Sequence, residues 1–219
     1  MKERGVLLKL WEAKAFEAGT KTLLVRPVVH VGGVKTSGYA WEQATRLDAD
    51  GSWIFWSSAR PGLQEFAQRT YPNGGGVMPP YAVRDVLWGK ETWNMANIER
   101  DADGSIIDWS LWKGALPSSL PEGWQLGYAA NGHSGDGYLW RPSTHMPRWA
   151  SRITRKVTRV SALRILDIND DELRGIGTTD PDNVDAAHRA MFEMYWSTDW
   201  PKYPYATNPW AWLYDVTQP

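Results

Sequence analysis

The chain has 219 residues, a length that suits one domain with a substantial core, and we expect a single domain over residues 1–219. Its 24 Lys and Arg residues oppose 25 Asp and Glu residues, and the formal net charge of −1 excludes strong attraction of the whole molecule to polyanions. The absence of cysteine excludes a disulfide framework, a thiolate metal site and a cysteine nucleophile.

The apolar residues are too dispersed to predict export or membrane insertion. Charged residues at Lys9, Glu12, Lys14 and Glu17 interrupt the N-terminal apolar residues before a signal-peptide core can form. No stretch approaches the roughly 20 consecutive apolar residues of a membrane span. We therefore expect a cytoplasmic protein without a membrane partner.

The first predicted elements are a helix, a turn and a strand. Apolar residues recur at helical spacing within residues 8–18, and Gly19 stands where a helix C-cap commonly lies. Residues 22–31 are rich in Val and Leu and contain Pro27, which predicts an edge strand or a bulge. Lys21 then lies at the junction of the helix and the strand.

A repeated pentapeptide predicts two hairpins. Asp-Ala-Asp-Gly-Ser occurs at residues 48–52 and 101–105, and Asp-Gly between apolar runs is typical of a hairpin turn. A calcium loop also begins Asp-x-Asp, but it needs glycine at its sixth position, where this chain has Trp53 and Ile106. We expect no calcium site, and the histidines show no spacing that gathers ligands for another metal.

The rest of the chain predicts loops, strands and one more helix. Regions about 57–80 and 114–137 are rich in Gly, Pro and Ser and are expected to be loop insertions. The patterns predict strands at residues 152–161 and 210–216 and a helix over residues 181–196. Short strands without a repeated strand–helix–strand unit favour an α+β fold, namely a small mixed β-barrel with flanking helices.

The segment best suited to a planar polar ligand is residues 140–152, Trp-Arg-Pro-Ser-Thr-His-Met-Pro-Arg-Trp-Ala-Ser-Arg. Its prolines stiffen a backbone that carries hydrogen-bond donors and aromatic faces. Basic side chains recur through residues 141–166 and no acidic one interrupts them. Two interpretations stay open: a cationic stripe that contacts phosphate, or a solvated strand balanced by the acidic residues within 167–185.

Four short motifs of the chain occur together in one protein family. They are segment 140–152, Lys21-Thr22, Leu-Trp-Gly-Lys-Glu-Thr-Trp at residues 87–93, and Asn-Pro-Trp at residues 208–210. With these motifs in the expected order along nearly its whole length, the chain resembles the phage and prophage branch of the ASCH family in the PUA-like superfamily. The resemblance implies a PUA-like barrel with a ligand cleft beside the first helix, turn and strand, and the host cytoplasm as its location if a phage encodes it.

The resemblance also implies candidate catalytic residues. Some small ASCH proteins are amidohydrolases that deacetylate N4-acetylcytidine with a lysine, a threonine three residues later and a glutamate from a helical segment. Lys21 matches that lysine, Leu24 without a hydroxyl stands at the threonine position, and Asp171 and Glu172 are the nearest candidates for the glutamate. Glu91 offers another acid, which could act as a general base or accept a hydrogen bond from the amino group of a nucleobase. The alternative is an ion pair of Glu91 with Lys90, Arg84 or a cleft arginine.

The other candidates would bind the ligand. Trp93 and Trp149 are expected to stack on bases, which is worth about 1–3 kcal/mol per base. His145 either donates to a base edge or holds the loop through a backbone carbonyl. The remaining candidates are Thr22, Arg26, Ser143, Arg148 and Arg152, of which Arg148 and Arg152 are expected on phosphate.

Three functions stay open, and none of them implies a cofactor. The first is a module that binds a nucleotide, a modified nucleoside, RNA or DNA in a cleft lined by Lys21, Glu91, Trp93 and the 143–152 loop. The second is an amidohydrolase on N-acylated pyrimidine nucleosides, with Lys21 and either Glu91 or Glu172 as the acid–base pair. The third is a phage interaction module that grips a partner protein with exposed aromatic loops. The sequence does not indicate the oligomeric state.

Overall fold

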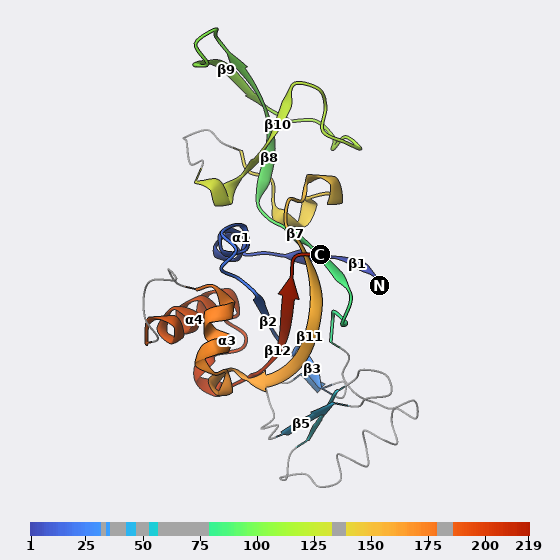
Figure 1. Cartoon of the computed structure of the whole chain (residues 1–219), viewed down its shortest axis with the longest axis vertical. Coiled ribbons are helices and arrows are strands. Elements are labelled where there is room, and N and C mark those ends of the chain that lie inside the picture. Colours follow the sequence, from blue (N-terminus) through green and yellow to red (C-terminus); the bar gives the residue numbers. More distant parts are fainter. Residues whose placement is uncertain (32–33, 36–42, 47–52, 57–78, 133–138, 179–185) are drawn as a thin grey trace. The chain divides into compact units, whose positions relative to one another are not determined.

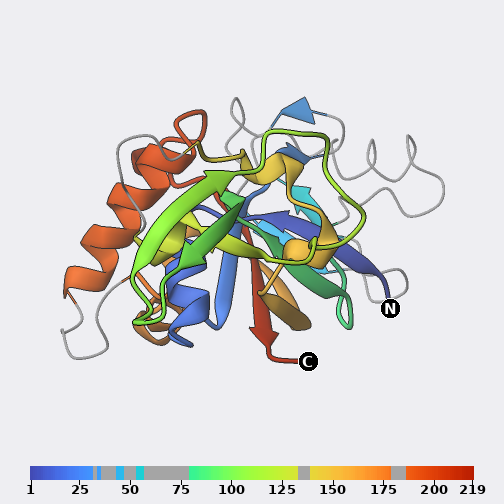
Figure 2. The same cartoon turned by 90° about the horizontal axis from the view of Figure 1, so that it is seen from above.

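A computed structural model describes residues 1–31, 34–35, 43–46, 53–56, 79–132, 139–178 and 186–219 (Figures 1 and 2). The chain divides into two compact units. The first unit comprises Met1–Gly19, Val86–Arg155 and Gln218–Pro219, and the second comprises Thr20–Asp85 and Lys156–Thr217. The expectation of one domain over residues 1–219 stays a prediction.

The fold class is α+β, as expected from the sequence. Helices and β-sheets occur together in the described part of the chain. The strand pairs recorded there form open sheets, so the closed PUA-like barrel stays a prediction. Within the described ranges, no helix combines the length and apolar character that crossing a membrane requires.

In the first unit, two parallel strands lie beside a helix. β1 (Glu3–Leu7) pairs with β7 (Val86–Lys90), and α1 (Leu10–Glu17) follows β1. Leu87 and Gly89 are buried while their neighbours along β7 are partly exposed, which is the alternation of a strand with one covered face. Gly19 adopts a φ of +76° just after α1, so the predicted helix and turn are confirmed.

A three-stranded antiparallel sheet forms the rest of the framework of the first unit. Its strand order is β10 (Trp124–Tyr128), β8 (Trp93–Arg100) and β9 (Ile106–Leu111), which run side by side in Figure 1. Residues 101–105 join β8 to β9, and the Asp101 carboxylate accepts hydrogen bonds from two backbone amides of this turn. The hairpin predicted there is confirmed.

The two predicted loop insertions have different outcomes. In the segment 114–137, Trp124–Tyr128 form β10 and Ala129–Asn131 form the short helix η2, so the expected loop is wrong there, and residues 133–137 lie outside the described residues. Backbone pairing with β8 overrides the Gly- and Pro-rich composition around Trp124–Tyr128. Of the segment 57–80, residues 57–78 lie outside the described residues, as does the first Asp-Ala-Asp-Gly-Ser at 48–52. The strands on either side of that pentapeptide, β5 (Gln43–Arg46) and β6 (Trp53–Trp56), pair antiparallel.

One face of the three-stranded sheet carries the core of the first unit. Trp93, Met95 and Tyr128 point to this face and pack against Met146 and Ala150. Both Met146 and Ala150 belong to the segment with η3 (Ser143–His145) and η4 (Arg148–Ala150). The proline-containing segment 143–152, called the 143–152 loop below, therefore lies on the sheet as part of the core.

In the second unit, three strands pair antiparallel. β12 (Trp210–Thr217) lies between β2 (Leu23–Pro27) and β11 (Thr154–Arg164), as Figure 1 shows, with β2 at the edge. β3 (His30–Val31) and β4 (Val34–Lys35) form a separate pair. The strands predicted at 22–31, 152–161 and 210–216 are confirmed, the first as β2 and β3.

Helices complete the second unit. α3 (Asp170–Ile176) begins at an Asn169 cap, and α4 (Ala186–Asp199) is the long orange-red helix of Figures 1 and 2. α4 confirms the predicted 181–196 helix from residue 186 onward, since residues 181–185 lie outside the described part. Two single turns, η5 (Ile165–Asp167) and η6 (Tyr205–Thr207), stand beside β11 and β12.

Candidate functional site

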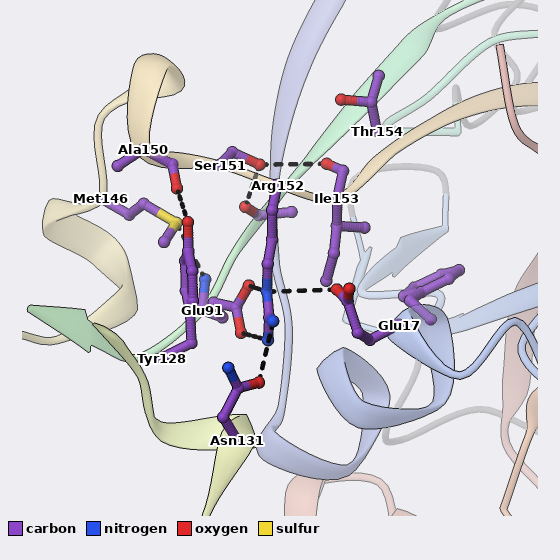
Figure 3. Close-up of polar contacts among 12 residues, drawn as sticks. Glu17, Glu91, Tyr128, Asn131, Met146, Ala150, Ser151, Arg152, Ile153 and Thr154 are labelled. Carbon is purple, nitrogen blue, oxygen red and sulfur yellow. Dashed lines mark hydrogen bonds and ion pairs between the residues drawn. The ribbon is translucent and has the colours of Figure 1, made fainter. Parts of the chain in front are cut away.

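The most elaborate polar cluster of the first unit surrounds Arg152. Glu91 follows β7 and is 2% exposed, and its two carboxylate oxygens accept hydrogen bonds from Arg152 Nε and Nη2 at 3.0 Å each (Figure 3). This bidentate geometry is the strongest form of arginine–carboxylate contact. Of the alternatives for Glu91, an ion pair with an arginine is therefore the observed arrangement.

Three further side chains surround the Arg152 guanidinium. Its carbon lies 4.1 Å from the centre of the Tyr128 ring, and Nη1 donates to Asn131 Oδ1 at 2.9 Å. Glu17 Oε2 lies 3.3 Å from Nε, and Figure 3 shows Arg152 between Tyr128 and Glu17. We call Glu17, Glu91, Tyr128, Asn131 and Arg152 the Arg152 cluster.

The two carboxylates of the Arg152 cluster differ sharply in exposure. The Glu91 side chain is 3% exposed and that of Glu17 is 52% exposed, with Arg152 at 19%. An exposed ion pair contributes about 0–1 kcal/mol, whereas removal of one partner of a buried pair costs about 3–5 kcal/mol. Glu91 is thus a fixed anchor for Arg152, and Glu17 is a weakly held outer contact.

The 143–152 loop is fastened to the end of β7 by hydrogen bonds. Ser151 Oγ donates to the Gly89 carbonyl at 2.7 Å, and Lys90 Nζ donates to the Thr144 carbonyl at 2.8 Å. Tyr128 OH donates to the Ala150 carbonyl at 2.9 Å. These contacts hold the loop in place and thereby fix the direction in which Arg152 projects.

The raised pKa of Tyr128 leads us to expect a lower free energy of unfolding in strong alkali. Burial and, to a smaller extent, the charge of Glu91 raise the pKa of Tyr128 from 10.0 to about 12. Because the folded protein holds this proton more tightly than the unfolded chain, its stabilisation is complete below pH 10 and is lost as pH rises toward 12, by roughly 2 kcal/mol. The free energy of unfolding, measured with a chemical denaturant between pH 9 and 12, should therefore fall more steeply with pH for the parent protein than for Tyr128→Phe. Parallel curves would contradict this linkage.

The predicted ligand residues of the 143–152 loop lie mostly at its surface. His145 is exposed, and Ser143 is half-buried in η3. Arg148 is exposed, with Nε 3.2 Å from Glu3 Oε2 and its guanidinium carbon 6.0 Å from the centre of the Trp88 ring. Trp149 is half-buried and packs edge to face on Trp93.

Trp93 requires a correction. Its side chain is 0% exposed, so its ring offers no face to a base, and the predicted stacking role is wrong in this structure. The ring lies instead in the core, against Met95, Tyr128 and Met146. The polar residues on either side of Trp93 in the sequence point away from the face that buries it.

Lys21 and Thr22 belong to the second unit, where they hold α3 against β2. Lys21 is 2% exposed, and its Nζ donates to the carbonyl of Ile176 at the end of α3 at 2.8 Å. The Thr22 backbone amide donates to the Gly175 carbonyl at 2.8 Å, while the Thr22 side chain is exposed. Leu24 is fully buried in β2 and supplies no hydroxyl.

The other two candidates of the second unit are also held by neighbours. The Glu172 carboxylate accepts a hydrogen bond from the backbone N–H of Asn169 as part of a capping box of α3, and one of its oxygens lies 3.8 Å from Arg159 Nη2. Arg26 donates to the Val25 carbonyl and lies 5.8 Å from the centre of the Trp200 ring. Because Lys21 and Glu172 belong to one unit and Glu91 to the other, a shared cleft stays a prediction.

The basic run of residues 141–166 is largely matched by acceptors. Arg159 pairs with Asp215, Arg155 donates to the Phe16 carbonyl, and Arg164 donates to the Asn208 carbonyl. Together with Arg148 and Arg152, this favours the balanced interpretation over a free cationic stripe. The carboxylates that balance the run lie mainly outside residues 167–185, at Glu3, Glu17, Glu91 and Asp215.

Three members of the Arg152 cluster were not predicted as site residues. Tyr128 and Asn131 fall in the segment expected to be a loop, and Glu17 lies at the end of α1. A carboxylate in the last turn of a helix interacts unfavourably with the helix dipole. Glu17 at this position therefore weakly indicates a compensating partner elsewhere in the fold.

Comparisons with known proteins give no relatives for this chain. No protein-family model matches it, and neither a curated protein nor a solved structure matches it.

Proposed function

We propose that the first unit binds the base of a nucleoside, a nucleotide or a nucleic-acid strand at the Arg152 cluster. The observation that carries this proposal is the fixed guanidinium of Arg152, which lies on the Tyr128 ring and is anchored by the buried Glu91. Proteins commonly stack unpaired bases on aromatic rings and on arginine guanidinium planes. A base would stack on the side of Arg152 that Glu17 now covers.

Displacement of Glu17 costs little in this scheme. Its side chain is 52% exposed and approaches Arg152 at 3.3 Å, outside the bidentate pair that Glu91 forms. Since an exposed pair contributes about 0–1 kcal/mol, a stacked base readily outweighs it. Glu91 stays in place during binding and keeps the guanidinium plane oriented.

Asn131 supplies a directed hydrogen-bond donor beside the stacking plane. Its Oδ1 accepts from Arg152 Nη1, which turns its Nδ2 group away from the arginine. The Asn131 side chain is exposed, and no further partner holds it among the described residues. A ring carbonyl or ring nitrogen of the base is the acceptor that this amide suits.

The proposal is consistent with the resemblance to the phage-type ASCH family. We extend it accordingly to a PUA-like barrel that acts in the cytoplasm on a nucleoside, nucleotide, RNA or DNA. It assigns Lys21 and Glu172 no catalytic step, because each is engaged in holding α3.

Calorimetric titration with uncharged nucleosides tests the proposal, with cytidine, uridine, adenosine, guanosine and N4-acetylcytidine as ligands. Glu17→Gln removes the internal competitor and should tighten binding about threefold to fivefold. Asn131→Ala removes one hydrogen bond and should weaken binding about threefold to tenfold.

The matched control is Glu122→Gln, an exposed carboxylate of the same unit, which should leave the affinity unchanged. Unchanged affinity in both Glu17→Gln and Asn131→Ala would overturn the proposal, as would the absence of binding to every nucleoside. Conversion of N4-acetylcytidine to cytidine that disappears in Lys21→Ala would replace it with the amidohydrolase.

A further inference from the structure

A second polar arrangement of the first unit lies on the core face of β8. Trp93 forms an antiparallel bridge with Arg141, in which each backbone amide donates to the other residue's carbonyl, at 2.8 and 3.3 Å. Residues opposite one another in such a pair project from the same face of the sheet, with Cβ atoms about 5 Å apart. The side chains of Trp93 and Arg141 therefore leave the sheet on the same face from directly opposite positions.

Both side chains carry a buried N–H group without an acceptor. Trp93 Nε1 and Arg141 Nε are enclosed and have no hydrogen-bond partner among the described residues. A buried donor without an acceptor costs about 1–3 kcal/mol, so an unpaired donor in a native protein calls for a missing acceptor. Here two such donors belong to one cross-strand pair.

Among the described residues, Arg141 also has no counter-ion. Its Nη2 donates to the carbonyls of Trp112 and Gly114, at 2.9 and 3.1 Å, and no carboxylate pairs with it in the described part of the chain. Arg148, Arg152 and Arg159 each pair with a carboxylate. Arg141 thus combines a half-buried positive charge with an unmatched donor.

We infer that Trp93 and Arg141 form an oxyanion site, which takes a phosphate or carboxylate oxygen between the indole N–H and the guanidinium. Such an oxygen would accept from both orphan donors and neutralise Arg141 at once. Tyr128 lies opposite Trp93 on the other side of β8, so Tyr128, Trp93 and Arg141 follow one another across the sheet.

This row relates the oxyanion site to the Arg152 cluster. Two interstrand spacings, about 10 Å, separate the backbone under Tyr128 from that under Arg141. A nucleoside monophosphate is of similar extent, so the oxyanion site suits the phosphate of a nucleotide whose base stacks on Arg152. This last step rests on the proposed function, whereas the oxyanion site itself does not.

The test uses the full chain with inorganic phosphate, and separately with acetate, as probes. Titration is followed by the ¹⁵N–¹H resonance of the Trp93 indole, assigned by its loss in Trp93→Phe, and by the melting temperature. Phosphate should shift this resonance and raise the melting temperature in the parent. Arg141→Met should weaken phosphate binding at least tenfold, and Trp93→Phe, which keeps the ring but removes the N–H, about threefold. An acetate response equal to that of phosphate would assign the site to carboxylates.

Arg100→Met, at an exposed arginine of the same unit, is the matched control and should bind phosphate as the parent does. An unmoved indole resonance, or equal losses in Arg100→Met and Arg141→Met, would overturn the inference and leave the two donors to water. Phosphate binding at Arg141 without nucleoside binding would contradict the proposed function but not the oxyanion site. Nucleoside binding without a phosphate response would contradict the oxyanion site but not the proposed function.

Discussion

Glu91→Ala is expected to lower the free energy of unfolding by about 3 kcal/mol, because it leaves the Arg152 guanidinium partly buried without its bidentate partner. The cost includes the lost hydrogen bonds at both carboxylate oxygens and the desolvation of the remaining charge. The nearby Glu17 is too exposed to replace Glu91. Urea unfolding followed by tryptophan fluorescence and circular dichroism measures the change.

The double variant Glu91→Ala/Arg152→Ala distinguishes the energy of the ion pair from the packing lost when each side chain is truncated. We expect it to be less destabilised than the sum of the two single variants by about 1–3 kcal/mol, since the second substitution removes the unpaired charge. Glu3→Ala, which breaks the exposed pair with Arg148, should change stability by about 0.5 kcal/mol or less. Additive effects at Glu91 and Arg152 would show that the two side chains do not stabilise each other.

Local sequence patterns predicted the elements whose partners are close in sequence or strongly periodic. The helix α1 with its glycine turn, the Asp101–Ser105 hairpin and β12 all agree with the structure, because helical period, turn chemistry and runs of aromatic and apolar residues act over short distances. The segment 114–137 was predicted wrongly as a loop. Its strand depends on pairing with β8, which the composition of the segment does not reveal.

The Arg152 cluster shows the same limit at the level of the site. Glu91 and Arg152 were each predicted as site residues, but they are 61 positions apart, and several partners were equally available to Glu91 on sequence alone. Tyr128 and Asn131 come from one further segment and Glu17 from another, and the packing of α1, η2 and the 143–152 loop within the first unit brings them together. A sequence motif indicates which residues are candidates for a site, whereas the fold determines which of them contact one another.

Lys21 illustrates how burial changes the interpretation of a motif. Its match to the family lysine suggested a cleft residue, yet the structure buries it with its ammonium group on the last carbonyl of α3. A cation at a helix C-terminus is stabilised by the helix dipole and by the unpaired carbonyls there. The position therefore has a structural use that needs no substrate.

Trp93→Ala should cost about 4 kcal/mol of unfolding free energy, within the range for removing a fully buried large aromatic side chain. Trp93→Phe should cost much less, because phenylalanine keeps most of the packing against Met95 and Tyr128 and removes the indole N–H, which has no acceptor among the described residues. Both variants are compared with the parent by urea unfolding in phosphate-free buffer, with Trp149→Phe as a control at a half-buried ring of the same cluster. A small effect of Trp93→Ala would mean that the ring is not part of the core, and the stacking role first expected for it would have to be considered again.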